Sequence, residues 1–358
     1  MSRYIVKLTP QGKYFFGGDM TFSAKSMKDK QFESYIISSF KMPQQTSLLG
    51  MLRFLLLSHD TEAFDIEGNH IKSKDAADLL IGKKSFSVND EHGRNDFGKI
   101  VGIGSCCLYD KTNDKYYFKA FPNDDLKADF TKADKVTVNG RELEIPKIKR
   151  KDGKKYSPKE PLSKEYVSDD DKTANPFIED DRIGIQKDYE GKTKDKSLYK
   201  QINYRLEKGF CFAFEAKVDD IDLAEYSGEI VKLGADASTF LLEAEKTEAD
   251  MPYMKAGSET ELVLLSDAYL EKPLEREGVL FAITTTKPFR FLSCENSERA
   301  SDYNVRYRWI RSEKRYDLYE AGSVFYFKDK ESRSKFCEYI DSYKDFAQIG
   351  YNKYCETK

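Results

Sequence analysis

The sequence predicts an α+β protein built on antiparallel sheets. Three observations favour this class: short stretches that alternate apolar and polar residues recur along the chain, two hairpin signals follow one another, and few segments have helical periodicity. The 358 residues exceed the roughly 100–200 that are usual for one domain. We therefore expect two domains, or one domain with a large insertion.

In the N-terminal part, a strand is expected at residues 4–8, followed by an irregular aromatic segment at residues 14–40. Pro43 opens the clearest helix of the chain, because proline is tolerated in the first helical turn. This helix is expected to end near Ser58, and an acidic, polar stretch follows it at residues 60–78.

Two hairpins are expected in the next part of the chain. The first pairs residues 100–109 with residues 116–121 across a polar turn. The second pairs residues 136–138 with residues 142–145 across an Asn-Gly dipeptide, which is the strongest short hairpin signal. Residues 147–181 carry a basic run and then an acidic run, which indicates an exposed, mobile excursion.

Strand-like stretches resume after this excursion, and the chain closes with a helix. The strands are expected at residues 210–217, 230–233, 261–265, 279–285 and 303–310. Apolar and aromatic side chains that recur at spacings of three and four predict a helix from residue 328 to about residue 354.

This order of strands and helices fits two ferredoxin-like (RRM-like) units. We expect an N-terminal ferredoxin-like domain over residues 1–205, with a charged insertion at about residues 147–205. A C-terminal ferredoxin-like domain with the terminal helix is expected over residues 206–358.

The composition indicates a folded protein with a strongly hydrated surface. Apolar residues make up 39% and charged residues 34% of the chain, and the 23 Tyr and 24 Phe side chains need burial or stacking partners. The 59 basic and 62 acidic side chains give a net charge of −3. A nucleic-acid partner therefore has to be recognised from local clusters, because the chain as a whole is not basic.

No segment is typical of a membrane span or a secretion signal. The longest apolar stretch, residues 48–57, is interrupted by Gly50 and Arg53 and is far shorter than the ~20 residues that a span requires. We expect a cytoplasmic protein that does not contact a membrane.

The cysteines and histidines favour no catalytic or metal site. The six cysteines form no CxxC pair and have no nearby histidine, so we expect reduced thiols, no zinc, no disulfide framework and no cofactor. None of the three histidines lies beside a Ser or Cys in a nucleophile motif, which argues against an enzyme.

The helix that follows Pro43 holds the first candidate site. Thr46, Gly50 and Arg53 recur at spacings of four and three and therefore share one face. Glycine inside a helix costs ~1 kcal/mol relative to alanine, which implies that backbone or a ligand approaches closely there. Two interpretations stay open. Arg53 pairs with an internal carboxylate, or a phosphate is held by Arg53 or by the free N–H groups of the helix start up to Ser47.

The second candidate site begins with Arg182, Gly184 and Gln186, which alternate with isoleucines and therefore share one strand face. Basic residues interleaved with tyrosines follow, namely Lys187, Lys192, Lys194, Lys196, Lys200 and Arg205 with Tyr189, Tyr199 and Tyr204. Cations for phosphates and rings for bases are typical of single-stranded RNA binding, with roughly 1–3 kcal/mol per stacked base. A solvated charged face is the alternative, because neighbouring carboxylates partly neutralise the cluster.

A third candidate is the small-residue turn at residues 321–323 and the aromatic strand that follows it. Five basic residues precede the turn, namely Arg306, Arg308, Arg311, Lys314 and Arg315. We favour a hairpin with an exposed basic edge here, because edge charges discourage pairing between sheets.

Together and in this order, the candidate segments resemble the RAMP superfamily of CRISPR proteins, and most closely the Cmr subunit at the foot of type III-B effector complexes. The helix with Ser47, Gly50 and Arg53 is similar to a P-x-x-S-x-x-G-x-x-R pattern, with one extra residue after Pro43. Arg182-Ile183-Gly184-Ile185 with Leu198-Tyr199 is similar to the R-[IV]-G-I…LY segment, the most specific piece.

Two further segments carry the resemblance. Residues 321–326 are similar to a C-terminal A-G-S-V-Y-Y strand. Leu233-Gly234 falls where a glycine-rich L-G-G occurs, and Ala235 departs from that pattern.

The resemblance implies binding of the repeat-derived 5′ handle of a guide RNA, docking onto the large polymerase/cyclase-like subunit and the first backbone RAMP subunit, and no nuclease activity, in antiviral RNA-guided defence. The residues that we expect to contact RNA are Ser47, Gly50, Arg53, Arg182, Gln186, Lys187, Lys192, Lys194, Lys196, Tyr199, Lys200 and Arg205.

Two alternatives stay open. One is a metal-independent RAMP endoribonuclease that processes repeat RNA, with His92 beside Gly93-Arg94 as the base. The other is the equivalent subunit of a neighbouring CRISPR subtype.

Overall fold

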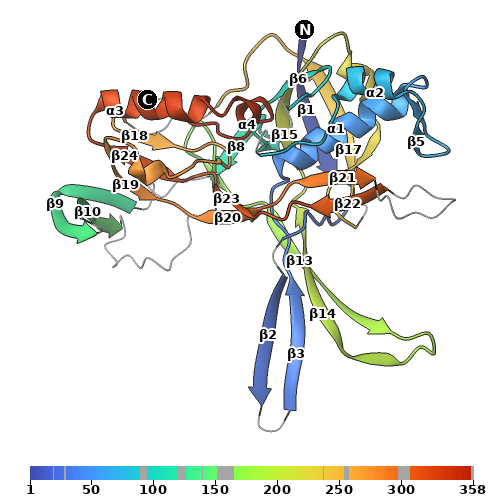
Figure 1. Ribbon diagram of the computed structural model, residues 1–358, viewed down its shortest axis with the longest axis horizontal. Coiled ribbons are helices and arrows are strands. Elements are labelled where there is room, and N and C mark those ends of the chain that lie inside the picture. Colours follow the sequence, from blue (N-terminus) through green and yellow to red (C-terminus); the bar gives the residue numbers. More distant parts are fainter. Residues whose placement is uncertain are drawn as a thin grey trace.

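The computed structural model of the protein consists mostly of strands and contains few helices (Figure 1). It describes residues 1–18, 20–27, 30–88, 95–119, 126–138, 140–150, 165–236, 238–253, 258–296 and 307–355. The mixture of strands and helices confirms the predicted combination of α and β structure. The division into two ferredoxin-like domains stays a prediction.

A nine-stranded antiparallel sheet forms the centre of the molecule, in the order β12-β11-β8-β7-β15-β1-β17-β16, with β6 also paired to β15. Its strands are β1 (Ser2–Pro10), β6 (Ile100–Ile103), β7 (Cys107–Asp110), β8 (Lys115–Lys119), β11 (Tyr166–Val167), β12 (Thr173–Ala174), β15 (Phe210–Val218), β16 (Ile230–Lys232) and β17 (Thr239–Lys246). In β1, Val6 lies opposite Phe214 of β15 and Ala244 of β17. Strands from both sides of residue 205 therefore share this sheet.

Both faces of the central sheet are buried, because alternate residues of β1 belong to different clusters. Val6 packs in one cluster with Leu48 and Leu52 of helix α1 (Gln45–His59). Ile5 packs in another with Val263 of the C-terminal part. The sheet thus lies between α1 and the C-terminal strands, which explains why its strands are apolar on both sides.

Two paired hairpins project from the main body (Figure 1). They form a four-stranded sheet in the order β13-β14-β3-β2. Its strands are β2 (Met20–Met27), β3 (Lys30–Ile37), β13 (Phe177–Lys187) and β14 (Thr193–Leu206). We call this sheet, residues 20–37 and 177–206, the finger. The irregular segment expected at residues 14–40 was therefore wrong, because β3 pairs in parallel with the distant β14 and no local pattern signals that contact.

The C-terminal part contributes three small antiparallel sheets. These are β18 (Glu261–Val263), β24 (Val324–Phe327) and β19 (Val279–Ile283), then β20 (Thr286–Phe289) with β23 (Tyr316–Tyr319), and β21 (Leu292–Asn296) with β22 (Tyr307–Arg311). Their core includes Leu262, Phe325 and Phe336. β18, β19, β22 and β24 lie close to positions expected from the sequence, whereas β20, β21 and β23 were not expected.

The single C-terminal helix expected at residues 328–354 is instead two helices, α3 (Lys330–Asp341) and α4 (Lys344–Gln348). The break falls at Tyr343, whose backbone is not helical (φ −82°, ψ 61°). The helical periodicity persists across the break, because Phe336, Tyr343 and Phe346 all pack on the core. Periodicity therefore predicted the buried face correctly and missed the interruption.

The two predicted hairpins are present, but the first is shorter than expected, because residues 100–103 form the separate strand β6, which pairs with β15. β7 pairs with β8, and β9 (Leu126–Val138) pairs with β10 (Arg141–Arg150). The excursion expected at residues 147–181 was wrong for Tyr166 and Val167, which are 4% and 3% exposed and pair with β8. Two apolar residues were enough to add a strand to the central sheet.

The remaining elements are short. They are β4 (Phe64–Asp65), β5 (His70–Ile71), α2 (Lys74–Ile81) and the 3-10 turns η2 (Leu223–Tyr226) and η3 (Pro273–Glu275). Among the helices that the structure describes, none combines the length and the apolar character needed to cross a membrane.

Candidate nucleic-acid interface

The finger holds most of the residues of the second candidate site, and its strand register divides them between two faces. Directly opposite residues in a sheet point to the same side. Gly184 of β13 lies opposite Tyr199 of β14, and Tyr199 lies opposite Tyr35 of β3. Arg182 shares this side, which we call the front face. Lys200 lies opposite Ile183 on the other side, which we call the back face.

Gly184 and Tyr199 form one unit on the front face. A Cβ atom on Gly184 would lie 2.2 Å from Cζ of the Tyr199 ring, so the ring rests on the glycine. The space that the missing side chain of Gly184 leaves beside Arg182 is therefore filled by this ring. This cross-strand contact explains why glycine and tyrosine occur together in the Arg-Ile-Gly-Ile…Leu-Tyr segment, because only glycine leaves room for the tyrosine ring.

Arg182 and Lys187 are two cations of the finger that are open to solvent. Both are exposed, and within the part of the chain that the structure describes their side chains make no hydrogen bond or ion pair. Their charges are therefore available to an external anion.

The other described cations of the candidate site have carboxylate partners. Lys200 Nζ lies 2.5 Å from an Asp181 oxygen, and Arg205 Nε lies 3.2 Å from an Asp180 oxygen. Lys192 pairs with Glu190 beside the hairpin turn at 2.9 Å. The sequence had indicated neutralisation by neighbouring carboxylates, which holds for Lys192 and Glu190, whereas Asp180 and Asp181 reach their partners from the adjacent strand β13.

Three predicted residues have side chains outside the described set. Their backbones lie in the finger, Gln186 in β13 and both Lys194 and Lys196 in β14. His92, the base of the alternative nuclease, falls with Gly93 and Arg94 outside the described residues altogether.

Arg53 of α1 points into the main body. Its Nη1 donates to the Lys84 carbonyl at 3.1 Å and its Nη2 to the Asp96 carbonyl at 2.7 Å. Burial lowers the pKa of the guanidinium to about 10, although the nearby Asp96 raises it. The structure favours the packing interpretation, with two backbone carbonyls in place of the expected carboxylate.

The Gly50 position contradicts one expectation. Gly50 is exposed, and nothing in the described chain lies within 4 Å of a Cβ atom placed there. The close approach expected from its own chain is therefore absent. Ser47, in the first turn of α1, donates its backbone N–H to the Gln44 carbonyl at 2.9 Å. Because α1 lies in the main body and the finger projects away from it, the two candidate sites stay separate (Figure 1).

The third candidate is part of the core. β24 lies between β18 and β19, and all four of its residues are buried. The expected hairpin with an exposed basic edge was wrong, because β24 pairs on both sides and β23 belongs to another sheet. Arg306 and the side chains of Arg308 and Arg311 are outside the described set.

Three lysines that the sequence analysis did not single out come together where the finger joins the main body. They are Lys41 after β3, Lys119 at the end of β8 and Lys287 in β20. Each ammonium lies over an aromatic ring, Lys41 over Phe177 at 5.1 Å, Lys119 over Tyr166 at 5.2 Å and Lys287 over Phe40 at 5.1 Å. We call these lysines, with Asp267 and Glu320, the root cluster. No sequence signal could have found it, since its members lie far apart in the chain.

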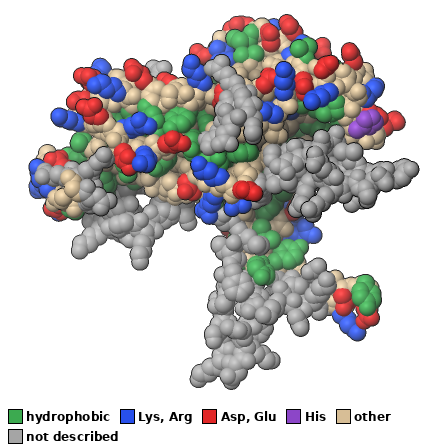
Figure 2. Space-filling view, viewed as in Figure 1, with side chains coloured by type: hydrophobic (Ala, Val, Ile, Leu, Met, Phe, Trp, Pro, Cys, Tyr) green, Lys and Arg blue, Asp and Glu red, His purple; other side chains and the backbone are tan. Residues whose placement is uncertain are grey.

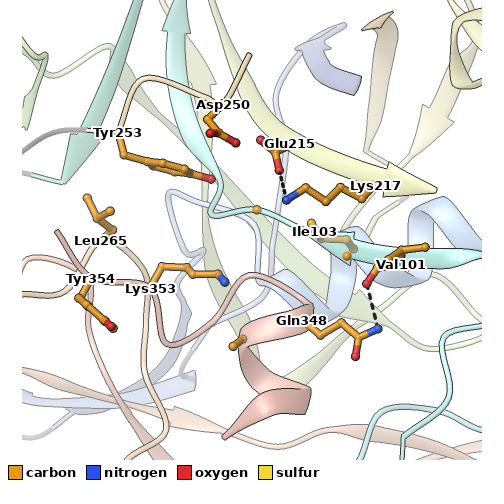
Figure 3. Close-up of a pocket in the computed structure, with 13 residues that line it drawn as sticks. Val101, Ile103, Glu215, Lys217, Asp250, Tyr253, Leu265, Gln348, Lys353 and Tyr354 are labelled. Atoms are coloured by element: carbon orange, nitrogen blue, oxygen red, sulfur yellow. Dashed lines mark hydrogen bonds and ion pairs between the residues drawn. The ribbon is translucent and has the colours of Figure 1, made fainter. Parts of the chain in front are cut away.

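A separate pocket of about 390 Å³ lies in the main body (Figure 3). Glu215 and Lys217 of β15 form an ion pair of 2.9 Å in its wall, and Gln348 Nε2 donates to the Val101 carbonyl at 2.9 Å. Burial, followed by the nearby Lys217, lowers the pKa of Lys353. None of the predicted site residues lines this pocket. It is therefore distinct from the finger and carries no part of the candidate interface.

Charges of both signs are interspersed over the main body (Figure 2). This agrees with the net charge of −3 and with cations that are confined to local positions. Within the described ranges, no three His, Cys, Asp or Glu side chains are placed to hold a metal ion.

A family model described as a CRISPR-associated protein (Cas_Cmr3) matches residues 6–355. No curated protein matches the chain. Among solved structures, it is similar to a chain of the type III-B Cmr-beta complex bound to cognate target RNA, at 14% identity over 99% of this chain and 96% of that chain, with a TM-score of 0.48.

Two further solved structures are similar. For the same complex with cognate target RNA and AMPPnP, the identity is 14% over 98% of this chain and 95% of that chain, with a TM-score of 0.47. For a Csm1-Csm4 cassette in complex with pppApA, the identity is 13% over 92% of this chain and 88% of that chain, with a TM-score of 0.34.

Proposed function

This chain belongs to the Cas_Cmr3 family of CRISPR-associated proteins, and from that premise we propose that it is a non-catalytic subunit of a type III-B Cmr effector complex in the cytoplasm. Its proposed role is to bind the repeat-derived 5′ handle of the guide RNA and to dock the large polymerase/cyclase-like subunit and the backbone RAMP subunits. Two ferredoxin-like domains that divide near residue 205 are part of this proposal.

The front face of the finger is the observation that carries RNA binding. It places the exposed guanidinium of Arg182 on the same side of one sheet as the Tyr199 ring and Tyr35. An arginine contacts phosphate through several N–H donors, and aromatic rings stack on bases of any sequence. A phosphate-binding arginine beside base-stacking rings fits single-stranded RNA that is recognised by its backbone and shape.

Exposed apolar side chains on the main body support docking of protein partners. Phe54 of α1 is 51% exposed and Leu79 of α2 is 72% exposed, with Ile66 at 62% between β4 and β5. α2 and β4 both contact α1, so these side chains lie in one region of the main body, and exposed apolar side chains gathered in one region are typical of interaction surfaces.

The Arg182→Ala/Lys187→Ala double variant tests RNA binding by the finger in the assembled complex. We expect the dissociation constant for guide-handle RNA to rise roughly 10-fold or more at low salt, because two open cations are lost. The plot of log affinity against log salt should become shallower by ~0.7 for each lost phosphate contact. The matched control is Lys272→Ala/Lys335→Ala, which removes two exposed cations elsewhere. An affinity and a salt slope that match the control would remove the finger from the proposal.

Gly184→Ala tests Tyr199 as a stacking platform. The new Cβ displaces the ring, and the fold should tolerate this because the clashing atoms are the far end of a side chain. We expect Gly184→Ala and Tyr199→Ala each to weaken RNA binding roughly 5- to 150-fold, which corresponds to one stacked base. The double variant should be no weaker than Tyr199→Ala alone, since both changes remove the same contact. Additive losses would instead show that Gly184 acts independently of the ring. Gly12→Ala, where a Cβ meets open space, is the control.

A further inference from the structure

The root cluster is continuous with the back face of the finger. Phe177 and Tyr204 lie at the start of β13 and near the end of β14, on the side of Ile183. The rings of Tyr166 and Phe177 are 5.3 Å apart, and those of Phe177 and Tyr204 are 6.3 Å apart. This row of rings therefore runs from the central sheet into the finger. The ammonium groups of Lys41 and Lys119 lie over it.

One ammonium of the root cluster lacks a partner of opposite charge. Within the part of the chain that the structure describes, Lys119 makes no hydrogen bond and no ion pair, and its ammonium lies over the Tyr166 ring. The side chain is half-buried, so solvent compensates its charge only in part. An unpaired cation in such surroundings favours the approach of an anion.

The two carboxylates of the cluster do not fill this role. Asp267 Oδ2 forms an ion pair with Lys287, and Asp267 Oδ1 accepts from the Ala321 N–H at 3.1 Å. The Glu320 carboxylate also forms no ion pair with Lys119, because no oxygen of it lies within 4.0 Å of the Lys119 ammonium nitrogen. Asp267 is therefore committed to Lys287 and to the Ala321 N–H, and neither carboxylate contacts the Lys119 ammonium.

We propose that the root cluster, through Lys119, binds a backbone phosphate of single-stranded RNA at the base of the finger. This inference rests on the proposed RNA-binding function and adds a second contact to it. The cluster lies on the back-face side, whereas Tyr199 lies on the front face. Bound RNA therefore passes the edge of the finger, and the two contacts contribute independently.

The protonation of Lys119 makes this contact depend on pH, and that dependence can be measured. Burial lowers its pKa to about 8, and Lys41 and Lys287 lower it while Glu320 and Asp267 raise it. The free ammonium therefore loses its proton as the pH rises through 8, and a bound phosphate opposes that loss. RNA binding through Lys119 should weaken above pH 8. Arginine at this position keeps its charge throughout this range.

The experiment measures binding of the full-length protein to a single-stranded oligoadenylate of about 12 nucleotides, a length within the usual site sizes. Adenine bases do not lose a proton between pH 7 and pH 9. We expect Lys119→Met to weaken binding roughly 3- to 10-fold at pH 7 and to lower the salt slope by ~0.7. Lys119→Arg should keep the affinity at pH 7 and lose the decline above pH 8. Lys335→Met, an exposed lysine on α3, is the matched control for charge.

Each outcome decides the assignment. If Lys119→Met binds RNA as well as Lys335→Met does, the root contact is overturned while the finger proposal stands. If Lys119→Met weakens RNA binding, Lys119→Arg does not restore it and the salt slope is unchanged, the loss of affinity is purely structural and the root contact is overturned. Absence of RNA binding by the unmodified protein overturns the proposed function and this inference together. Lys119-dependent binding of an oligoglutamate of equal charge, without Lys119-dependent RNA binding, assigns the cluster to an acidic protein segment and overturns the RNA contact.

Discussion

Arg53→Ala is expected to lose roughly 2–5 kcal/mol of the free energy of unfolding, with no change in RNA affinity while the protein stays folded. The guanidinium donates to the carbonyls of Lys84 and Asp96, which belong to the segment that follows α2. Removing it leaves two acceptors without their donor, and each buried unpaired acceptor costs ~1–3 kcal/mol. Denaturant unfolding and RNA binding of the same preparation measure the two effects.

Arg315→Ala is the matched control, because Arg315 is exposed and its contact with Asp317 is 3.7 Å long. A surface change of this kind costs less than ~0.5 kcal/mol. If Arg53→Ala keeps its stability and loses RNA affinity, Arg53 contacts phosphate and the packing interpretation is wrong. The comparison therefore decides between the two interpretations that the sequence left open.

Gly350→Ala is expected to destabilise the fold by roughly 3–6 kcal/mol through two separate causes, backbone strain and overpacking. Gly350 has a φ of +90°, which alanine rarely adopts. A Cβ atom there would lie 1.7 Å from Gln45 Nε2 and 2.4 Å from the Gly104 carbonyl oxygen. It would also displace the hydrogen bond of 2.7 Å between that amide and that carbonyl.

Gly228→Ala separates these causes. Gly228 has a similar φ of +97°, and a Cβ atom there meets nothing within 4 Å. Strain alone should cost ~1–3 kcal/mol at this position. Equal losses for the two variants in thermal or denaturant unfolding would show that the contact with α1 and β6 contributes nothing. A larger loss for Gly350→Ala measures how strongly the C-terminal segment is fixed to the N-terminal helix.

The sequence predicted those helices and hairpins of this fold that depend on residues close together in the chain. The helix expected from Pro43 to about Ser58 is α1 (Gln45–His59), and β9 pairs with β10 on either side of the Asn-Gly dipeptide, as expected. In both cases residues a few positions apart determine the structure, through helical periodicity or turn conformation. The finger was missed, because β3 pairs with a strand far away in the chain.

The sequence predicted the candidate site as one continuous segment. The structure shows which of its cations have carboxylate partners and which do not. Arg182 and Lys187 are open, whereas Lys200 and Arg205 have carboxylate partners. The sequence placed Gly184 on one strand face with Arg182, and the structure shows that the Tyr199 ring rests on it. Sequence spacing alone cannot give such partners, because they depend on strand register.

The sequence by itself determined the folded, nearly neutral character of the chain, its main strands and first helix, and the motifs by which it resembles its family. Only the tertiary structure decided which charges remain open. It turned Arg53 inward, paired Lys200 with Asp181, and brought Lys41, Lys119 and Lys287 to the root of the finger. The physical reason is that secondary structure follows from neighbouring residues, whereas the state of a charge depends on every group that folding places around it.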